Sequence, residues 1–208
     1  MAKKVLHVGC GQATIKNMPS GFNDGTWQEV RYDIAKSVKP DIIGSMQDMS
    51  AVETGSVDAL FSAHNIEHVF AHEVVPVLKE FRRALKDDGF CIITCPDIEM
   101  VCRLVAKNGK LAEPLYQSPA GPITALDIIY GHTDSIAQGS DFMAHKTGFS
   151  AQILLKRLED AGFAKIYGQQ RPSKLDMWFI AYKNDIALER AKESFGRYTG
   201  VPLKGSKP

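Results

Sequence analysis

The sequence lacks the long apolar run that a membrane span requires. No apolar stretch in its 208 residues approaches the ~20 residues that cross a bilayer. The first four residues, Met-Ala-Lys-Lys, lead directly into a short predicted strand, without the apolar core of a signal peptide. We therefore expect a cytoplasmic protein with no membrane partner. At this length we also expect a single domain, spanning 1–208, with a substantial core.

The sequence also lacks an excess of either charge and any paired cysteine motif. It has 25 Lys and Arg against 24 Asp and Glu, a net charge of +1, so electrostatics gives no reason to expect a nucleic-acid partner. Cys91 and Cys95 share one predicted strand, and Cys10 and Cys102 show no paired spacing. These positions indicate neither a disulfide framework nor a Cys-x-x-Cys metal site. We interpret the cysteines as buried free thiols.

A glycine turn follows the first apolar segment of the chain. Val5–Val8 consists of apolar β-formers around one histidine, and it leads directly into Gly9-Cys10-Gly11. This pattern predicts a buried strand that ends in a tight turn with exposed backbone. In an open α/β sheet, such a turn lies at the carboxyl ends of the strands, where nucleotide-like ligands bind.

A dinucleotide-binding turn would have a third glycine, followed by an amphipathic helix. Here the third-glycine position is Thr14, and Pro19, Gly21 and Gly25 interrupt the residues that follow. We therefore expect the helix over 12–26 to be short or missing. Loop backbone, rather than a strong helix N-terminus, would then hold the ligand.

Three further short strands are predicted before residue 65, at Trp27–Asp33, within 41–48 and at Val57–Ala63. Asp33 closes the first of them, about twenty positions past the glycine turn. That place suits an acidic residue that accepts hydrogen bonds from ribose hydroxyls. Asp48 lies near the same predicted edge of the sheet.

The rest of the chain alternates helices and strands. We predict helices over 74–85, 97–106 and 150–161, with Gly89 as the glycine C-cap of the first, and a strand at Phe90–Cys95. Two more strands, at 164–168 and 176–182, should form an antiparallel hairpin. The C-terminal segment 185–208 should contain a last helix from Leu188 and end in a loose tail. Between two of these helices, 108–147 is rich in proline and glycine, which predicts an irregular segment. Long insertions of this kind often form lids and substrate loops, so we expect it to cover a binding site.

Several motifs together resemble those of class I S-adenosylmethionine-dependent methyltransferases. They are the Val-Gly-Cys-Gly turn, Asp33 at the end of the second strand, SAHNIEHV at Ser62–Val69, LKEFRRALKDDG at Leu78–Gly89, and Pro96-Asp97. The last three are similar to a series found in small bacterial methyltransferases, some of them associated with cell-surface glycan pathways. The resemblance implies a Rossmann-like α/β fold. Its doubly wound sheet would have about seven strands, mostly parallel, with an antiparallel last strand.

The resemblance also implies S-adenosylmethionine as the cofactor and assigns residues to it. Gly9, Cys10 and Gly11 would pack against the methionine part, and Asp33 would accept hydrogen bonds from the ribose. Asp48, with Met49 beside it, would face the adenine. Ser62, Ala63 and His64 would flank the sulfonium and the acceptor. The reaction would be methyl transfer to a small-molecule or glycan-type acceptor, and the sequence leaves a homodimer open.

A hydroxyl acceptor needs a base that titrates near neutrality, and histidine is the usual choice. His64 follows the carboxyl end of a predicted strand, which makes it our first candidate for a catalytic residue. His145 in the insertion is the second, and His132 is a further alternative. Tyr130 and Asp141 are candidates for lining the pocket.

Three other functions are consistent with parts of the sequence. The spelling His64-x-x-Glu67-His68 matches an inverted zinc-protease signature, but a strand–helix junction at His64 argues against it, and we predict no metal site. The missing third glycine disfavours a nicotinamide-dependent oxidoreductase. A regulatory protein that binds S-adenosylmethionine without catalysis would have the same cofactor motifs.

Overall fold

The central sheet takes strands from both halves of the chain. The structure is a computed structural model that describes residues 2–118 and 120–200. Within these residues, seven strands form one sheet in the order β3-β2-β1-β4-β5-β9-β8. Their bounds are β1 Lys3–Val8, β2 Trp27–Asp33, β3 Ile42–Ile43, β4 Val57–Ala63, β5 Leu85–Pro96, β8 Lys165–Arg171 and β9 Asp176–Tyr182.

One strand of this sheet, β9, runs against its neighbours. It pairs antiparallel with both β5 and β8, whereas β1 pairs in parallel with β2 and β4, and β4 with β5. The hairpin of β8 and β9 was expected from the short connection between them. The predicted Rossmann-like sheet, mostly parallel with one antiparallel strand near its end, is confirmed.

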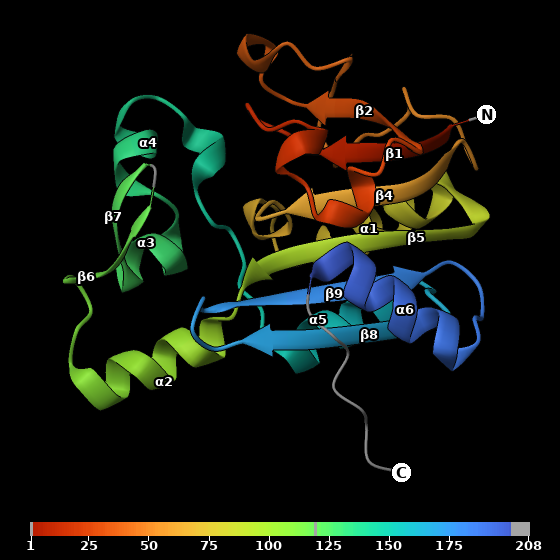
Figure 1. Cartoon of the computed structure of the whole chain (residues 1–208). Coiled ribbons are helices and arrows are strands. Elements are labelled where there is room, and N and C mark those ends of the chain that lie inside the picture. The colour runs from red at the N-terminus through yellow and green to blue at the C-terminus, as the bar shows by residue number, and fades with distance from the viewer. Residues whose placement is uncertain (1, 119, 201–208) are drawn as a thin grey trace.

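Helices cover both faces of the sheet (Figure 1). α1 (Val74–Ala84) and α5 (Ala151–Asp160) pack on one face, and α6 (Leu188–Thr199) packs on the other. Each has an apolar stripe at helical spacing, from which Leu78, Leu154 and Phe195 are fully buried. The doubly wound arrangement therefore follows from three amphipathic helices around a sheet that is buried on both faces.

No α-helix follows the glycine turn within the described residues. The segment 12–26 contains two short 3₁₀ helices, η1 (Ile15–Asn17) and η2 (Ser20–Phe22). Phe22 is fully buried, and its ring centroid lies 4.8 Å from that of Tyr198 on α6. The short or missing helix was predicted correctly, and α6 covers the part of the sheet that it leaves open.

The insertion is more regular than expected. α2 (Ile98–Asn108) leads into it, and it contains the hairpin of β6 (Pro114–Ser118) and β7 (Gly121–Thr124), followed by α3 (Ala125–Tyr130), α4 (Thr133–Ala137) and the 3₁₀ helix η5 (Asp141–Met143). The expectation of an irregular segment was wrong, because these elements are short and are held by contacts with one another and with α2. The β6–β7, α3 and α4 lobe lies beyond the carboxyl ends of the parallel strands (Figure 1).

Two local expectations were also wrong. α1 ends at Ala84, and Leu85 is already extended, so Gly89 is not its C-cap. A Cβ at Gly89 would lie 2.9 Å from the carbonyl oxygen of Lys86, so this position favours glycine through a close backbone approach. Cys102 is exposed on α2, whereas Cys10, Cys91 and Cys95 are buried thiols as expected.

Two further 3₁₀ helices lie at the edge of the sheet where the parallel strands end. They are η3 (Lys36–Val38) and η4 (Ile66–His68), which follow β2 and β4. No helix in the described part of the chain is long and apolar enough to cross a membrane. Beyond Gly200, the predicted tail falls outside the described residues.

Candidate active site

The strand register brings the predicted site residues to one edge of the sheet. Val8, the last residue of β1, pairs with Tyr32 on β2 and with Ser62 on β4. The residues that follow these partners therefore lie side by side at the carboxyl ends of the strands. They include Gly9 and Asp33, as the sequence predicted.

The glycine turn has a backbone that only glycine adopts easily. Gly9 and Gly11 have φ angles of 65° and 52°. The side chain of Asn65 lies against Gly9, and a Cβ there would be 2.5 Å from it. Around Gly11 a Cβ would meet nothing within 4 Å. The first glycine is thus required by both backbone and packing, and the second by the backbone alone.

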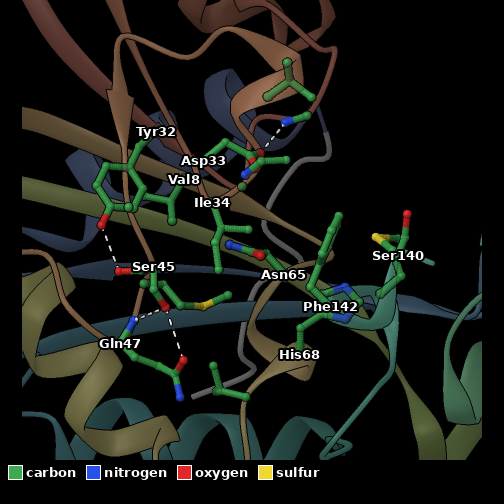
Figure 2. Close-up of a pocket in the computed structure, with 18 of the residues that line it drawn as sticks. Val8, Tyr32, Asp33, Ile34, Ser45, Gln47, Asn65, His68, Ser140 and Phe142 are labelled. Carbon is green, nitrogen blue, oxygen red and sulfur yellow. Dashed lines mark hydrogen bonds between the residues drawn. The ribbon is translucent and has the colours of Figure 1, made fainter. Parts of the chain in front are cut away.

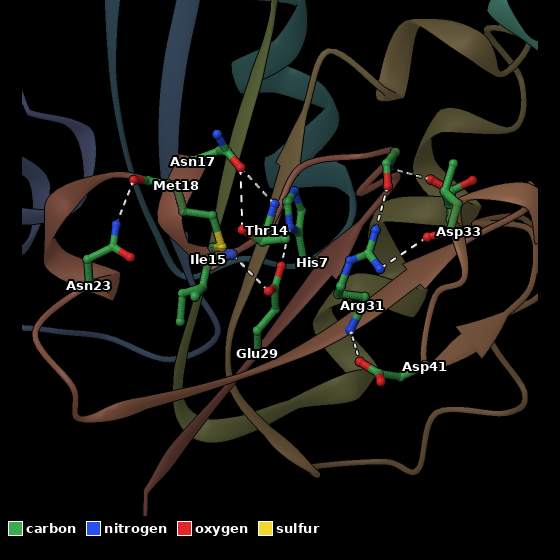
Figure 3. A network of polar contacts seen from close by, with 12 residues as sticks. His7, Thr14, Ile15, Asn17, Met18, Asn23, Glu29, Arg31, Asp33 and Asp41 are labelled. Carbon is green, nitrogen blue, oxygen red and sulfur yellow. Dashed lines mark hydrogen bonds and ion pairs between the residues drawn. The ribbon is translucent and has the colours of Figure 1, made fainter.

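Side chains of β2 fix the outer part of this turn (Figure 3). The Oδ2 atom of Asp33 accepts a hydrogen bond of 2.7 Å from the N–H of Gly11, and its Oδ1 atom accepts one of 2.8 Å from the N–H of Ala35. Arg31 donates from Nη2 to the carbonyl oxygen of Gly11 at 2.6 Å. The turn is held in place by its neighbour strand before any ligand arrives.

A buried pair that the sequence analysis missed holds the loop after the turn. His7 and Glu29 approach within 2.7 Å, between Nδ1 and Oε1, and the other oxygen of Glu29 accepts from the N–H of Ile15 at 2.7 Å (Figure 3). Burial lowers the pKa of His7, although Glu29 opposes that effect. Alternation along β1 could have indicated that a histidine between buried apolar residues needs a partner. The pair replaces the missing helix as the support of this loop.

The largest cavity at this edge has a volume of about 460 Å³ (Figure 2). The glycine turn and Asp33 form one wall, and Phe142 and Met143 of the insertion form the other. Ile34 and Phe142 both line it, with 53% and 46% of their surface exposed. Exposed apolar side chains on opposite walls of a cavity form a slot for a flat apolar group.

These residues fit an adenosyl group. Each carboxylate oxygen of Asp33 has one backbone donor and a further lone pair, so it can accept a ribose hydroxyl as well. The slot between Ile34 and Phe142 suits the adenine ring, and the cavity volume lies within the usual range for small-ligand sites, about 300–1,000 Å³.

Two smaller cavities adjoin the first, and His64 lines all three. The second, of about 330 Å³, is formed with the insertion and includes Tyr116, Asp127, His132 and Lys174. The third, of about 450 Å³, includes Cys10 and Ala63 beside Gly9. His64 is therefore the point at which the three spaces meet.

His64 itself has a left-handed backbone, with φ of 49°, and half of its side chain is exposed. Its Nδ1 atom lies 3.7 Å from Glu67 Oε1, and its Nε2 atom lies 3.8 Å from Asp176 Oδ2. Partial desolvation lowers the pKa of His64, but the two carboxylates outweigh it and raise the pKa. A non-glycine residue in this region costs about 1–3 kcal/mol, and such strain is often found at functional sites.

The second candidate base, His145, lies in the second cavity. It donates from Nδ1 to the carbonyl oxygen of Ile128 at 2.9 Å, and its ring lies edge-on to His68, with centroids 4.9 Å apart. Burial lowers the pKa of His145. His132 lines the same cavity, whereas Tyr130 and Asp141 are exposed and do not line it.

The adenine side of the first cavity differs from the expectation. Met49 is fully buried in the core, and Asp48 is exposed, with its carboxylate accepting from the N–H of Ser50. Neither lines the cavity, whereas Met46 and Gln47 do. The loop after β3 turns so that Tyr32 donates to the carbonyl oxygen of Asp48, which directs Met49 inward. Ser62 is likewise fully buried and lines none of the three cavities, whereas Ala63 lines the third and His64 lines all three.

The segment from His64 to His68, whose sequence matches the inverted zinc-protease signature, does not form an α-helix. His64 has the left-handed backbone, and η4 contains three residues, so His64 and His68 do not lie one turn apart on an α-helix. Sequence reasoning gave Glu67 no role of its own beyond the motifs that contain it, and it assigned no role to the cavity residues Asn65, Ile34 and Phe142.

Comparison with known proteins gives the same fold. Residues 6–93 match a family model described as a methyltransferase domain. The similar solved structures include a SAM-dependent methyltransferase, possible histamine N-methyltransferase, from Thermotoga maritima, at 15% identity and a TM-score of 0.55, covering 88% of this chain and 83% of that one. A SAM-dependent methyltransferase from Methanosarcina mazei has 14% identity and a TM-score of 0.57, with 88% and 94% covered. One from Mesorhizobium loti has 14% identity and a TM-score of 0.57, with 86% and 90% covered. No curated protein matches the sequence significantly.

Proposed function

We propose that the chain is a class I S-adenosylmethionine-dependent methyltransferase, with S-adenosylmethionine as its cofactor, and that it methylates a small-molecule or glycan-type acceptor in the second cavity. The insertion would cover this acceptor, and His64 would act as its base. The observation that carries the proposal is the position of His64, where the cofactor cavity meets the other two.

The cofactor supplies an activated methyl group on a good leaving group. The protein then has to align the acceptor atom with the sulfonium, and such alignment can contribute up to ~7–11 kcal/mol. A cavity wall shared by the cofactor and acceptor sites is what this alignment needs. His64 and His68 line both of them, as does Met143 from the insertion.

We assign the parts of the cofactor to the cavities on the same grounds. Asp33 would accept the ribose hydroxyls, and Ile34 with Phe142 would hold the adenine. The methionine part would extend along Gly9 and Gly11 toward the third cavity, where Cys10 and Ala63 lie next to His64. This keeps the sequence-based roles of the glycine turn and Asp33, and it moves the adenine contact from Asp48 and Met49 to Met46 and Gln47.

The second cavity supports a hydroxylated acceptor. Its lining mixes apolar Ile123 and Ile128 with polar Tyr116, His132 and Lys174, a composition that can hold a ring and bind its hydroxyl groups. A base within reach of such a hydroxyl typically contributes 10²–10⁴-fold to the rate. His64 faces this cavity with half of its side chain exposed.

Calorimetric titration with S-adenosylhomocysteine, followed by activity against sugars, small phenols and amines, tests the proposal. We expect binding of S-adenosylhomocysteine, methylation of at least one hydroxylated acceptor, and a rate for His64→Ala that is lower by about 10²–10⁴-fold. The matched control is His72→Ala, an exposed histidine outside these cavities. Equal loss in both variants, or binding of the cofactor product with no turnover on any acceptor, would contradict the proposal; the second result would favour a regulatory protein.

A further inference from the structure

Glu67 is a buried acidic residue without a hydrogen-bonding partner. Its residue surface is 1% exposed, and neither carboxylate oxygen has a hydrogen bond to any other described residue. The Nδ1 atom of His64 lies 3.7 Å from Oε1 of Glu67, within the range of an ion pair but beyond hydrogen-bonding distance, so His64 does not satisfy either oxygen. An ionised carboxylate is costly to bury unless a positive charge or a metal ion is close to it.

Two histidines near this carboxylate have their Nδ1 atoms already engaged. His68 donates from Nδ1 to the carbonyl oxygen of Ala144 at 3.2 Å, and His145 donates from Nδ1 to that of Ile128 at 2.9 Å. A carbonyl oxygen only accepts hydrogen bonds, so Nδ1 carries the proton in both rings. In the neutral ring, the Nε2 atom of each then has a free lone pair.

We propose that Glu67, His68 and His145 form a binding site for a divalent transition-metal ion of the Zn²⁺ class. One ligating atom from each residue lies within 4.8 Å of the others, close enough for small side-chain rotations to bring them around one ion. Two imidazoles and one carboxylate form a typical three-ligand set that leaves coordination positions open. A ring whose other nitrogen donates to a backbone carbonyl is the usual geometry of a histidine that binds a metal.

This proposed ligand set differs from that of the inverted zinc-protease signature noted in the sequence. Glu67 and His68 come from η4, but the third ligand is His145 of the insertion instead of His64. Backbone hydrogen bonds also join η4 to the insertion at this point. The N–H groups of Lys146 and Thr147 donate to the carbonyl oxygen of Glu67 at 2.8 and 3.2 Å. A bound ion would therefore link the insertion to the sheet.

The site lies between the two cavities assigned to cofactor and acceptor. All three residues line the second cavity, and His68 also lines the first. The open positions of the ion would be completed by water or by an oxygen atom of a ligand in the second cavity. Imidazole ligands favour Zn²⁺, Co²⁺ or Fe²⁺ over Mg²⁺ and Ca²⁺, which prefer oxygen ligands alone.

Calorimetric titration of the chelator-treated full chain with Zn²⁺ tests this site. We expect one ion per chain and no comparable binding of Mg²⁺. Loss of an outer-shell partner weakens metal sites by about 10–100-fold, so Glu67→Gln and His145→Ala, which remove ligands, should weaken binding by at least ~100-fold. His72→Ala and Cys102→Ser are controls at exposed positions and should bind as the unaltered protein does.

A second measurement identifies the ligands without relying on the variants' affinity. The Co²⁺-substituted protein should show d–d absorption bands without the charge-transfer band of a thiolate ligand. Binding of S-adenosylhomocysteine to each variant verifies its fold and tests the cofactor site separately, so the metal proposal and the proposed function can fail independently. Absence of Zn²⁺ binding, a thiolate band, or equal Zn²⁺ affinity in Glu67→Gln, His145→Ala and the unaltered protein would overturn the metal site.

Discussion

The Asp33 carboxylate and the backbone N–H of Gly11 are joined by a hydrogen bond of 2.7 Å. The residue proposed to bind the ribose is thus also the one that orders the glycine turn. Because Asp33 accepts from Ala35 as well, both carboxylate oxygens are positioned by backbone donors on two loops. Ligand binding and loop order depend on the same side chain.

Asp33→Asn should weaken the binding of S-adenosylhomocysteine. Hydrogen bonds to a charged group contribute about 1.5–3 kcal/mol each, and loss of one corresponds to roughly 10- to 150-fold in affinity. Titration calorimetry measures the change. Asp48→Asn is the matched control and also tests the sequence-based adenine contact: since Asp48 is exposed and outside the cavity, we expect unaltered affinity. An equal loss in both variants would contradict the geometry described for the adenine side.

Gly9→Ala should destabilise the fold more than Gly11→Ala. Both positions have positive φ, which costs an alanine roughly 1–2 kcal/mol. At Gly9 the new Cβ would also lie 2.5 Å from the Asn65 side chain, whereas at Gly11 it has open space. Denaturant unfolding of the two variants gives the difference. The double variant Gly9→Ala/Asn65→Ala should recover the packing part of the loss, and no recovery would show that Asn65 is not the cause.

Phe142→Ala should reduce cofactor affinity while leaving the free energy of unfolding nearly unchanged. The ring is 46% exposed in the cavity, so its full burial occurs only against a ligand. Removing a large apolar contact of this kind costs about 1–2 kcal/mol, roughly 5- to 30-fold in affinity. Tyr130→Ala is the control, an exposed aromatic residue of the same insertion outside the cavity. If the two variants bind S-adenosylhomocysteine equally well, the insertion does not close over the adenine.

The features of this molecule that could be predicted are those determined by residues close together in the sequence. The bounds of β2, where Trp27, Val30 and Tyr32 lie among polar residues, and of the mostly apolar β4 follow from the local sequence. Asp33 follows from its place at a strand end. The position of Met49 could not be predicted in this way. Its loop conformation is set by a hydrogen bond from Tyr32 to the Asp48 carbonyl, and no pattern near residue 49 records it.

The insertion and the Glu67 site required contacts between distant segments. His145 is fixed by Ile128 and faces Glu67, so its surroundings come from three separate places in the chain. A sequence pattern could identify these residue types as reactive, but it could not show that His145 of the insertion joins His64 and His68 around the buried carboxylate.

Asp127 provides a test of how the insertion is held together. Its carboxylate accepts from the N–H and hydroxyl of Thr124 at 2.9 and 2.7 Å, and from those of Thr133 at 3.1 and 2.8 Å. It therefore joins β7, α3 and α4. Burial raises the pKa of Asp127, but these hydrogen bonds outweigh burial and hold it well below its ordinary value of 3.8.

The sign of the pH effect follows from this lowered pKa. A carboxylate with a depressed folded-state pKa stabilises the fold fully above its unfolded pKa, and the contribution is lost as the pH falls through the folded value. Asp127→Asn should therefore be less stable than the unaltered protein at pH 7, by about 1.5–3 kcal/mol. The difference should shrink below a pH of about 3.8, where the unfolded chain binds the proton first. Denaturant unfolding at pH 7 and pH 3 measures it, with the exposed Asp141→Asn as control. A difference independent of pH would mean that the ionisation of Asp127 does not contribute to stability, and that the loss comes only from the acceptor oxygen that the amide nitrogen of asparagine replaces.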